Sequence, residues 1–225
     1  GGVWCGMVLR TAGYSMIWPF MTSDVSDRLG AELTHVTILM TLNSTVGIIS
    51  SFIAGTIVDK VGRKWGMVAS LSGMSIYSLR MSRADSWAAC AVLISLSGFI
   101  NPLYQISSDA MMADMIPPEK RADAYSLARM SHNAGIALGP AIGGFIAQIS
   151  YSISFFIAAA GLMTFCILLA VFARETIPHR QPGYKAPDPV VKSKEETGGY
   201  RRVLQDKPYI LFVLSLILTY VCVSM

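Results

Sequence analysis

The chain has 225 residues, of which 53% are hydrophobic and 14% are charged, and its formal net charge is +4. A soluble domain carries about 25% charged residues, so this composition excludes a soluble globular protein and indicates a membrane protein. The four cysteines and three histidines are scattered, and no nucleophile–base pair or nucleotide-binding loop is present. The sequence therefore predicts no enzyme, no metal site and no cofactor.

Seven apolar runs are long enough to cross a bilayer, and this pattern predicts an all-α membrane protein. No basic region or small-residue cleavage site of a signal peptide precedes the first run. The last run stops without a flanking charge, so we interpret the chain as a fragment of a longer protein. The runs are Val3–Met21, Thr34–Val58, Trp65–Met81, Trp87–Ile116, Asp123–Ile149, Tyr151–Phe172 and Tyr209–Met225.

The first span carries a basic residue, Arg10, followed by Tyr14 and Trp18 at four-residue steps. An ionisable residue at membrane depth is costly and is usually functional. Arg10 and Tyr14 are therefore candidate cavity residues. The alternative is an arginine whose long side chain reaches back to the inner membrane surface.

The second span leads into a charged turn, GTIVDKVGRK, at residues 55–64. Small residues on one helix face allow close backbone approach in lipid. The carboxylate of Asp59 at the end of this helix needs a partner, such as Arg63 or the N-terminus of another helix. An ordinary helix–helix seam with a charged turn is the alternative. The face repeats every four residues and consists of Asn43, Gly47, Ser51, Gly55 and Asp59.

This turn resembles the loop 2–3 motif of the major facilitator superfamily, G-x-x-x-D-[RK]-x-G-[RK]-[RK]. The resemblance implies the N-terminal six-helix bundle of that fold plus the start of helix 7, with the C-terminal half missing. It also implies that the motif's Asp pairs with its Arg and latches the outward-open state, and that Asp114 joins the charge cluster. The matching residues are Gly55, Asp59, Lys60, Gly62, Arg63 and Lys64.

The fourth span carries a polar column of Asn101, Gln105 and Asp109, with Pro102 predicting a bend. In the superfamily, helices 1 and 4 line the central cavity. We therefore hypothesise that Arg10 and Asp109 face this cavity and pair, and that Asp109 is a proton or cation site. A purely structural salt bridge is the alternative.

The fifth span contains GIALGPAIGG, which resembles the helix 5 motif of drug:proton antiporters, where it packs against helix 8. A generic glycine packing face is the alternative. Arg129 and Asn133 precede the motif, as the resemblance to these antiporters implies, and are further candidate cavity or coupling residues. One departure is Ile94 in the fourth span, where such antiporters usually carry an arginine. The motif residues are Gly135, Gly139, Pro140, Gly143 and Gly144.

The Lys and Arg residues are distributed unevenly between alternate loops. Thirteen lie in 59–64, 117–122 and 173–208, against three in 22–33, 80–86 and 149–151. Cytoplasmic loops collect Lys and Arg, which predicts a cytoplasmic N-terminus and explains the basic charge without nucleic acid. The sequence predicts a six-helix unit (1–173), a cytoplasmic linker (174–208) and a truncated seventh helix (209–225).

These features predict a secondary active transporter that works by alternating access, with proton-coupled efflux of small amphipathic compounds as the first hypothesis. An uptake carrier for a sugar, amino acid or other metabolite is the second, and a non-transporting membrane scaffold or receptor is the third. The expected partners are the lipid bilayer, a small-molecule substrate and protons. The expected location is the plasma (inner) membrane of a prokaryote.

Overall fold

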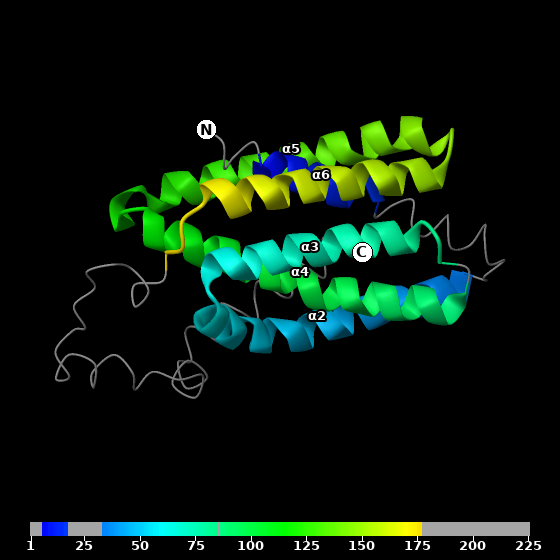
Figure 1. Cartoon of the computed structure of the whole chain (residues 1–225), viewed down its shortest axis with the longest axis horizontal. Coiled ribbons are helices and arrows are strands. Elements are labelled where there is room, and N and C mark those ends of the chain that lie inside the picture. The colour runs from blue at the N-terminus through cyan, green and yellow to red at the C-terminus, as the bar shows by residue number, and fades with distance from the viewer. Residues whose placement is uncertain (1–5, 18–32, 85, 177–225) are drawn as a thin grey trace, which may run out of the picture. The chain divides into compact units, whose positions relative to one another are not determined.

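The computed structural model describes residues 6–17, 33–84 and 86–176. The chain divides into two compact units, Gly1–Gln181 and Pro182–Met225, and every described residue lies in the first. Figure 1 shows that the long helices of this unit run side by side. They are an N-terminal helix over residues 6–17, α2 (Leu33–Val61), α3 (Arg63–Met81), α4 (Trp87–Met115), α5 (Arg121–Ala147) and α6 (Tyr151–Phe172), with a 3-10 helix η1 (Pro118–Lys120) before α5.

The helices confirm the all-α class that the apolar runs predict. The five predicted spans from the second to the sixth match α2 to α6 to within three residues at each end. The first span, predicted over residues 3–21, is helical over the described residues 6–17. The predicted linker from residue 177 onward and the seventh span lie outside the described residues.

Helix α2 packs mainly against α4, and small and polar residues make the contact. Asn43 Nδ2 donates hydrogen bonds to the Ile94 carbonyl at 2.8 Å and to Ser97 Oγ at 2.9 Å. A Cβ on Gly98 would collide with the carbonyl oxygen of Asn43. The close approach therefore depends on a glycine in α4, as expected for helices packed in lipid.

Helix α3 lies between α4 and α6, and serines line its buried face. Ser75 Oγ donates to the Ala159 carbonyl of α6 at 2.9 Å, and Ser70 and Ser78 are also buried. These hydroxyls lower the hydropathy of α3.

Among the described helices, only three are both long and apolar enough to cross a membrane on length and composition, with spans at Thr34–Val61, Trp87–Met115 and Tyr151–Phe172.

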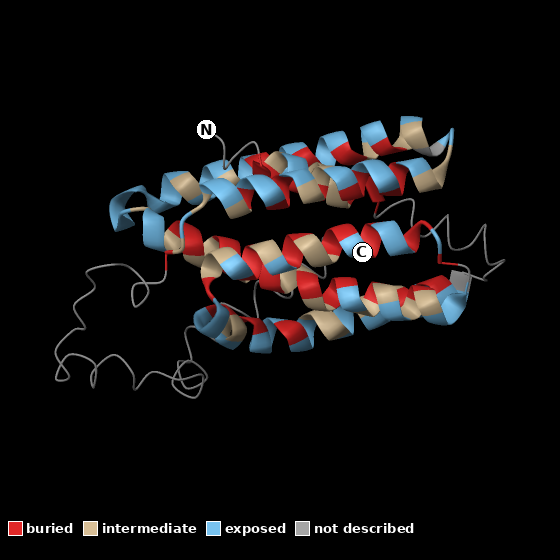
Figure 2. Ribbon diagram, viewed as in Figure 1, coloured by how far each residue is buried: buried red, intermediate tan, exposed pale blue. Residues whose placement is uncertain are grey.

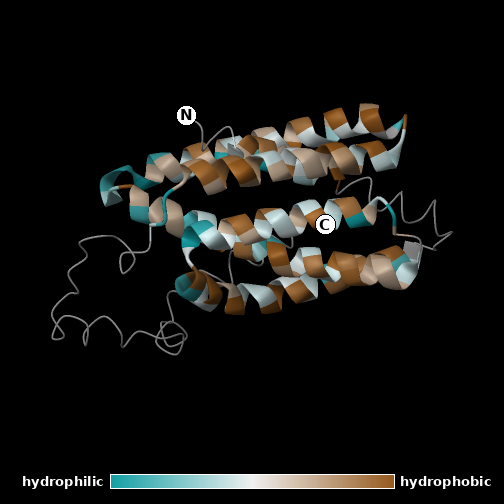
Figure 3. Cartoon of the chain, viewed as in Figure 1, coloured by the Kyte–Doolittle hydropathy of each residue, from teal (hydrophilic) through white to brown (hydrophobic). Residues whose placement is uncertain are grey.

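Large apolar side chains cover much of the outside of the bundle. Phe52 of α2 is 65% exposed, Phe145 of α5 is 76% exposed and Phe172 of α6 is 78% exposed. The outer edge of α5 is exposed in Figure 2 and hydrophobic in Figure 3. An apolar outer surface of this extent suits a hydrocarbon solvent, because in water it would be an aggregation hazard.

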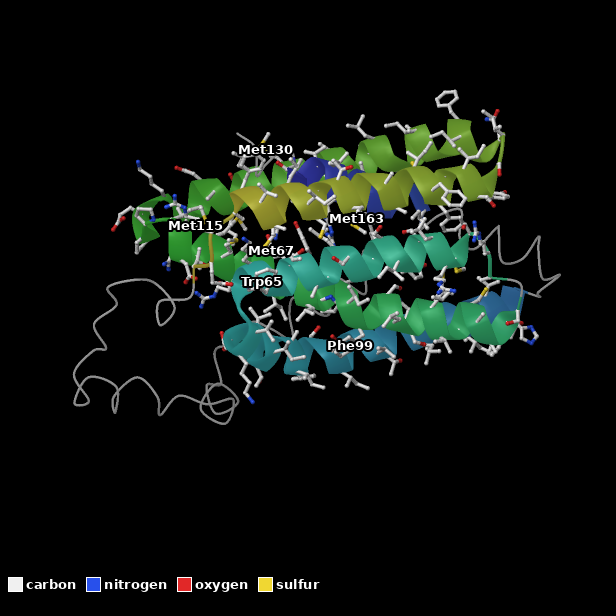
Figure 4. All side chains as sticks on the ribbon, viewed as in Figure 1. Trp65, Met67, Phe99, Met115, Met130 and Met163 are labelled. Carbon is white, nitrogen blue, oxygen red and sulfur yellow. The ribbon has the colours of Figure 1, made fainter. Side chains whose placement is uncertain are left out.

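The polar residues of the bundle gather at the end where α2 meets α3 and α4 ends (Figure 3). Figure 4 shows Trp65, near the start of α3, and Met115, the last residue of α4, at this same end. The predicted basic loops 59–64 and 117–122 both belong to it. The fold thus brings two of the three basic loops to one side.

Candidate functional site

Two glycines of the predicted helix 5 motif let α5 touch the N-terminal helix backbone to backbone. A Cβ on Gly135 would lie 2.6 Å from Thr11 Cβ, and one on Gly139 would lie 2.7 Å from the Ala12 carbonyl oxygen. Ser15 Oγ donates to the Gly135 carbonyl at 2.9 Å across this seam. The resemblance implies that this face packs against helix 8. In the described bundle, however, Gly135 and Gly139 pack against the N-terminal helix.

The other motif residues lie further along α5. Gly143 is buried, Gly144 is half-buried, and Pro140 lies inside the helix without ending it. A proline at this place removes one backbone donor.

A pocket of about 390 Å³ opens between the N-terminal helix, α4 and α5. Its size falls within the range of about 300–1,000 Å³ typical of small-molecule sites. We call it the central pocket. Its lining comes from the N-terminal helix (Met7, Arg10, Thr11), from α4 (Tyr104, Gln105, Ser108, Asp109, Met112) and from α5 (Tyr125, Ala128, Arg129, His132).

Arg10 is almost completely buried, with 6% of its surface exposed. Its Nη2 donates a hydrogen bond to Asn101 Oδ1. Its guanidinium carbon lies 4.3 Å from the centre of the Tyr104 ring and 5.7 Å from that of Tyr14. Cation–π contacts of this kind attract a desolvated guanidinium to an aromatic face without neutralising its charge.

The hypothesised Arg10–Asp109 ion pair is not formed among the described residues, although both side chains line the central pocket. Both carboxylate oxygens of Asp109 accept from Gln105 Nε2 at 3.2 Å. Gln105 is the residue one helical turn earlier, so this local partner takes the place of the distant arginine. The Asp109 carbonyl also accepts from the Tyr125 hydroxyl at 3.2 Å, which joins α4 to α5.

The remaining predicted cavity residues divide into two groups. Gln105 and Arg129 line the central pocket, whereas Asn101 supports Arg10 and Asn133 is exposed outside the lining. His132 also lines the pocket, and its Nδ1 lies 3.3 Å from Thr11 Oγ1.

Two lining residues of α4, Tyr104 and Ser108, were not predicted from the sequence, although a signal for them exists. They follow Asn101 at steps of three and four residues, which places them on the same face of α4 as the polar column.

A second group of charges lies where α3 begins. Arg63 forms a salt bridge with Asp114 at the end of α4, and its backbone N–H donates to Glu175 Oε1 at 3.0 Å. We call Arg63, Asp114 and Glu175 the turn cluster. Glu175 follows α6 and supplies the anion that the N-terminus of α3 favours, because Gly62 has no side chain to cap it.

Gly62 is the single residue between α2 and α3, so the charged turn is shorter than the predicted loop 59–64. Its φ is 119°, in the left-handed region that glycine tolerates best. A Cβ there would also collide with the carboxylate of Glu175. The turn therefore requires glycine for two independent reasons.

Toward the turn, the predicted contact face of α2 is exposed and does not pack against another described helix. A Cβ on Gly55 would meet no described atom within 4 Å, and Ser51, Asp59 and Lys60 are exposed. Asp59 makes no ion pair with any described residue, so the expected Asp59–Arg63 pair is replaced by Arg63–Asp114. Lys64 lies with its Nζ 5.4 Å from the centre of the Trp65 ring.

The described residues contain no group of three or more His, Cys, Asp or Glu side chains placed to hold a metal ion. The lining of the central pocket itself offers charged, hydrogen-bonding and aromatic side chains.

A sequence profile described as the Major Facilitator Superfamily matches residues 3–225. The chain belongs to this superfamily. Members are multi-pass integral membrane proteins, so the resemblance of the charged turn at residues 55–64 is confirmed at the level of the family.

Two bacterial relatives illustrate the match to the superfamily. YttB of Bacillus subtilis, an uncharacterized MFS-type transporter, is 29% identical over 167 residues, which are 73% of this chain and 41% of YttB. The multidrug resistance protein MdtH of Salmonella paratyphi B is 25% identical over 213 residues, which are 93% of this chain and 49% of MdtH. The chain thus spans less than half the length of these relatives.

Solved structures show the same fold. The peptide transporter POT matches 96% of this chain and 45% of its own chain, with a TM-score of 0.70 at 17% identity. The human organic anion transporter MFSD10 matches 83% of this chain and 50% of its own, with a TM-score of 0.65 at 17% identity. At such identity the likeness concerns the fold alone, and it supports the prediction of a major facilitator bundle.

Proposed function

We propose that the chain is one half of a secondary active transporter that exports small amphipathic compounds against a proton gradient. The central pocket carries the proposal: it places Arg10, Asp109 and Arg129 together inside a bundle of the transporter family. Charged residues at membrane depth are retained where they meet a substrate or a proton. The multidrug resistance name of the relative MdtH supports the choice of substrate class.

In this proposal, residues 1–173 form the N-terminal unit, 174–208 a cytoplasmic linker and 209–225 the start of the next helix. Transport requires a second unit against which the first rocks. The N-terminus lies in the cytoplasm of a prokaryote, because thirteen Lys and Arg residues fall on one set of loops against three on the other.

Asp59 acts in this proposal as the contact to the second unit. Its carboxylate is exposed and makes no ion pair with any described residue. Neutralising Asp59 is expected to change the balance between inward-open and outward-open states while leaving the bundle folded.

The test is flux into proteoliposomes that contain the complete protein. An imposed pH gradient is expected to drive accumulation of an amphipathic anionic dye such as 8-anilinonaphthalene-1-sulfonate, and a protonophore is expected to abolish it. Asp109→Asn is expected to remove the response to the gradient. Dye movement that ignores the gradient would support the uptake-carrier alternative, and absence of any flux would overturn the transport proposal.

A further inference from the structure

We infer that the central pocket selects substrates with an anionic group, which Arg10 of the N-terminal helix and Arg129 of α5 bind together. This inference rests on the proposed transport function, because it takes the central pocket as the substrate site. It goes beyond that function by naming the charge of the substrate.

The formal charges of the pocket lining carry the first step. The lining includes two guanidinium groups, those of Arg10 and Arg129, and one carboxylate, that of Asp109. No described residue forms a salt bridge with either arginine. The central pocket therefore presents an excess of positive charge, which raises the local concentration of anions and disfavours cations.

Arg10 is held in place by neutral groups. Asn101 accepts one of its hydrogen bonds, and the Tyr104 ring lies under the guanidinium group. A guanidinium has five N–H donors, so a hydrogen bond to an amide and a ring contact leave its charge uncompensated. A buried positive charge held by neutral partners stabilises an anion that enters beside it.

Arg129 lines the central pocket from α5, about 12 Å along that helix from its first residue at a rise of about 1.5 Å per residue. Its side chain is exposed and makes no hydrogen bond or ion pair with any described residue. An arginine at such a depth in a membrane helix is expensive unless it meets water or an anion. A carboxylate or sulfonate fits its planar fork with two parallel hydrogen bonds.

Asp109 does not neutralise either arginine, because Gln105 donates to both of its carboxylate oxygens. The carboxylate is thereby retained on its own helix. Its negative charge repels an anion, so the anionic group is expected to bind at the two arginines.

The rest of the lining suits an apolar body attached to the anion. Tyr104 and Tyr125 contribute aromatic faces, and Met7 and Met112 contribute adaptable thioethers. A volume of about 390 Å³ accommodates one or two fused rings. The substrate class is therefore an aromatic or otherwise amphipathic organic anion.

Equilibrium binding to the complete protein in nanodiscs tests this inference. The probes are radiolabelled 1-naphthoate and 1-naphthylmethylammonium, which share a ring system and differ in charge. We expect naphthoate to bind at least about tenfold more tightly, which corresponds to one charge-assisted contact.

The variants use Arg129, because its exposed side chain is not required for packing. Arg129→Gln is expected to weaken naphthoate binding by about tenfold, and Arg129→Lys to preserve the preference for the anion. Arg83→Gln is the matched control, since Arg83 is exposed just beyond the far end of α3 and its replacement removes the same formal charge. This control is expected to leave both probes unchanged.

Three results would overturn the inference. They are equal or tighter binding of the ammonium probe, no naphthoate binding above empty nanodiscs, and equal effects of Arg129→Gln and Arg83→Gln. Binding is read without flux, so a protein that binds naphthoate but moves nothing refutes the transport function and not the charge selection.

Discussion

Arg63 and Arg10 both belong to helices of one bundle, but their surroundings differ in kind. Arg63 meets the carboxylate of Asp114, and its backbone N–H meets that of Glu175. Arg10 meets an amide and two aromatic rings. The charges of the turn cluster therefore pair with one another and join three chain segments. In the central pocket, by contrast, no described carboxylate pairs with the positive charge of Arg10. Mutual pairing favours a structural role for the turn cluster, and the lack of pairing at Arg10 is the basis of the binding role proposed for the central pocket.

The largest effect is expected from Asp114→Ala, which removes the acid partner of Arg63 in the turn cluster. Both side chains are mostly buried, with 17% and 22% exposed. Loss of one partner of such a pair costs about 3 kcal/mol, because the other charge stays desolvated. Reversible SDS unfolding in mixed micelles measures the change in the free energy of unfolding.

Asp59→Ala is the matched control for this change, since Asp59 is an exposed aspartate of the same turn with no ion pair to a described residue. Its unfolding curve is expected to coincide with that of the wild type. Equal destabilisation by the two variants would contradict the structural role of the turn cluster.

The second effect is expected from Gly62→Ala, which forces a Cβ into a left-handed backbone position beside Glu175. Strain of this kind costs about 1–3 kcal/mol. In a Glu175→Ala background the collision disappears and only the backbone strain remains, so the same substitution is expected to cost less. A double-mutant cycle by thermal unfolding measures the difference, and a coupling of zero would show that Glu175 does not touch the turn.

The third substitution is expected to change the free energy of unfolding only slightly but to weaken substrate binding strongly. Arg10→Met removes a buried charge that no described carboxylate neutralises. The relief of its desolvation offsets the loss of the Asn101 hydrogen bond, so unfolding is expected to change by less than about 1 kcal/mol. Substrate binding, followed by radiolabelled naphthoate, is expected to fall sharply. Severe destabilisation with intact binding would reverse the contrast between the two regions.

The smallest effect is expected from Ser15→Ala, which removes the hydrogen bond to the Gly135 carbonyl. Interhelical hydrogen bonds in membranes contribute about 0.6 kcal/mol on average. Ser51→Ala is its control, because among the described residues the Ser51 hydroxyl bonds only to the Gly47 carbonyl within α2. Differential scanning fluorimetry of both variants should separate them by a small shift, and a larger loss for Ser51→Ala would contradict the role of the seam.

The helices were predictable because their ends carry strong local signals. Apolar runs bounded by glycine, proline and charge placed α2 to α6 to within three residues. The polar column of α4 was predictable from its spacing, since residues three and four apart share a face. Arg129 was a candidate only through the resemblance of the helix 5 motif to that of antiporters, and its place in the same pocket as the α4 column comes from the structure.

The partners of these residues were not predictable. Helix periodicity indicates which face is polar, but not which helix covers it. The sequence offers two acidic partners for Arg63, and only the packing of α3 against α4 selects Asp114 over Asp59. Glu175 was assigned to the linker by composition. Its contact with Arg63 was not predictable, because the two residues lie 112 positions apart in the chain.

The glycine contact between α5 and the N-terminal helix has a mechanical consequence. At Gly135 and Gly139 the backbone of α5 lies directly against Thr11, Ala12 and Ser15 of the N-terminal helix, so a side chain at either glycine would force the two helices apart. In the proposed transport cycle, a contact this close would make the two helices move as one body. Arg10 and Arg129 would then travel together, so the positive charge of the central pocket would stay on a single moving unit.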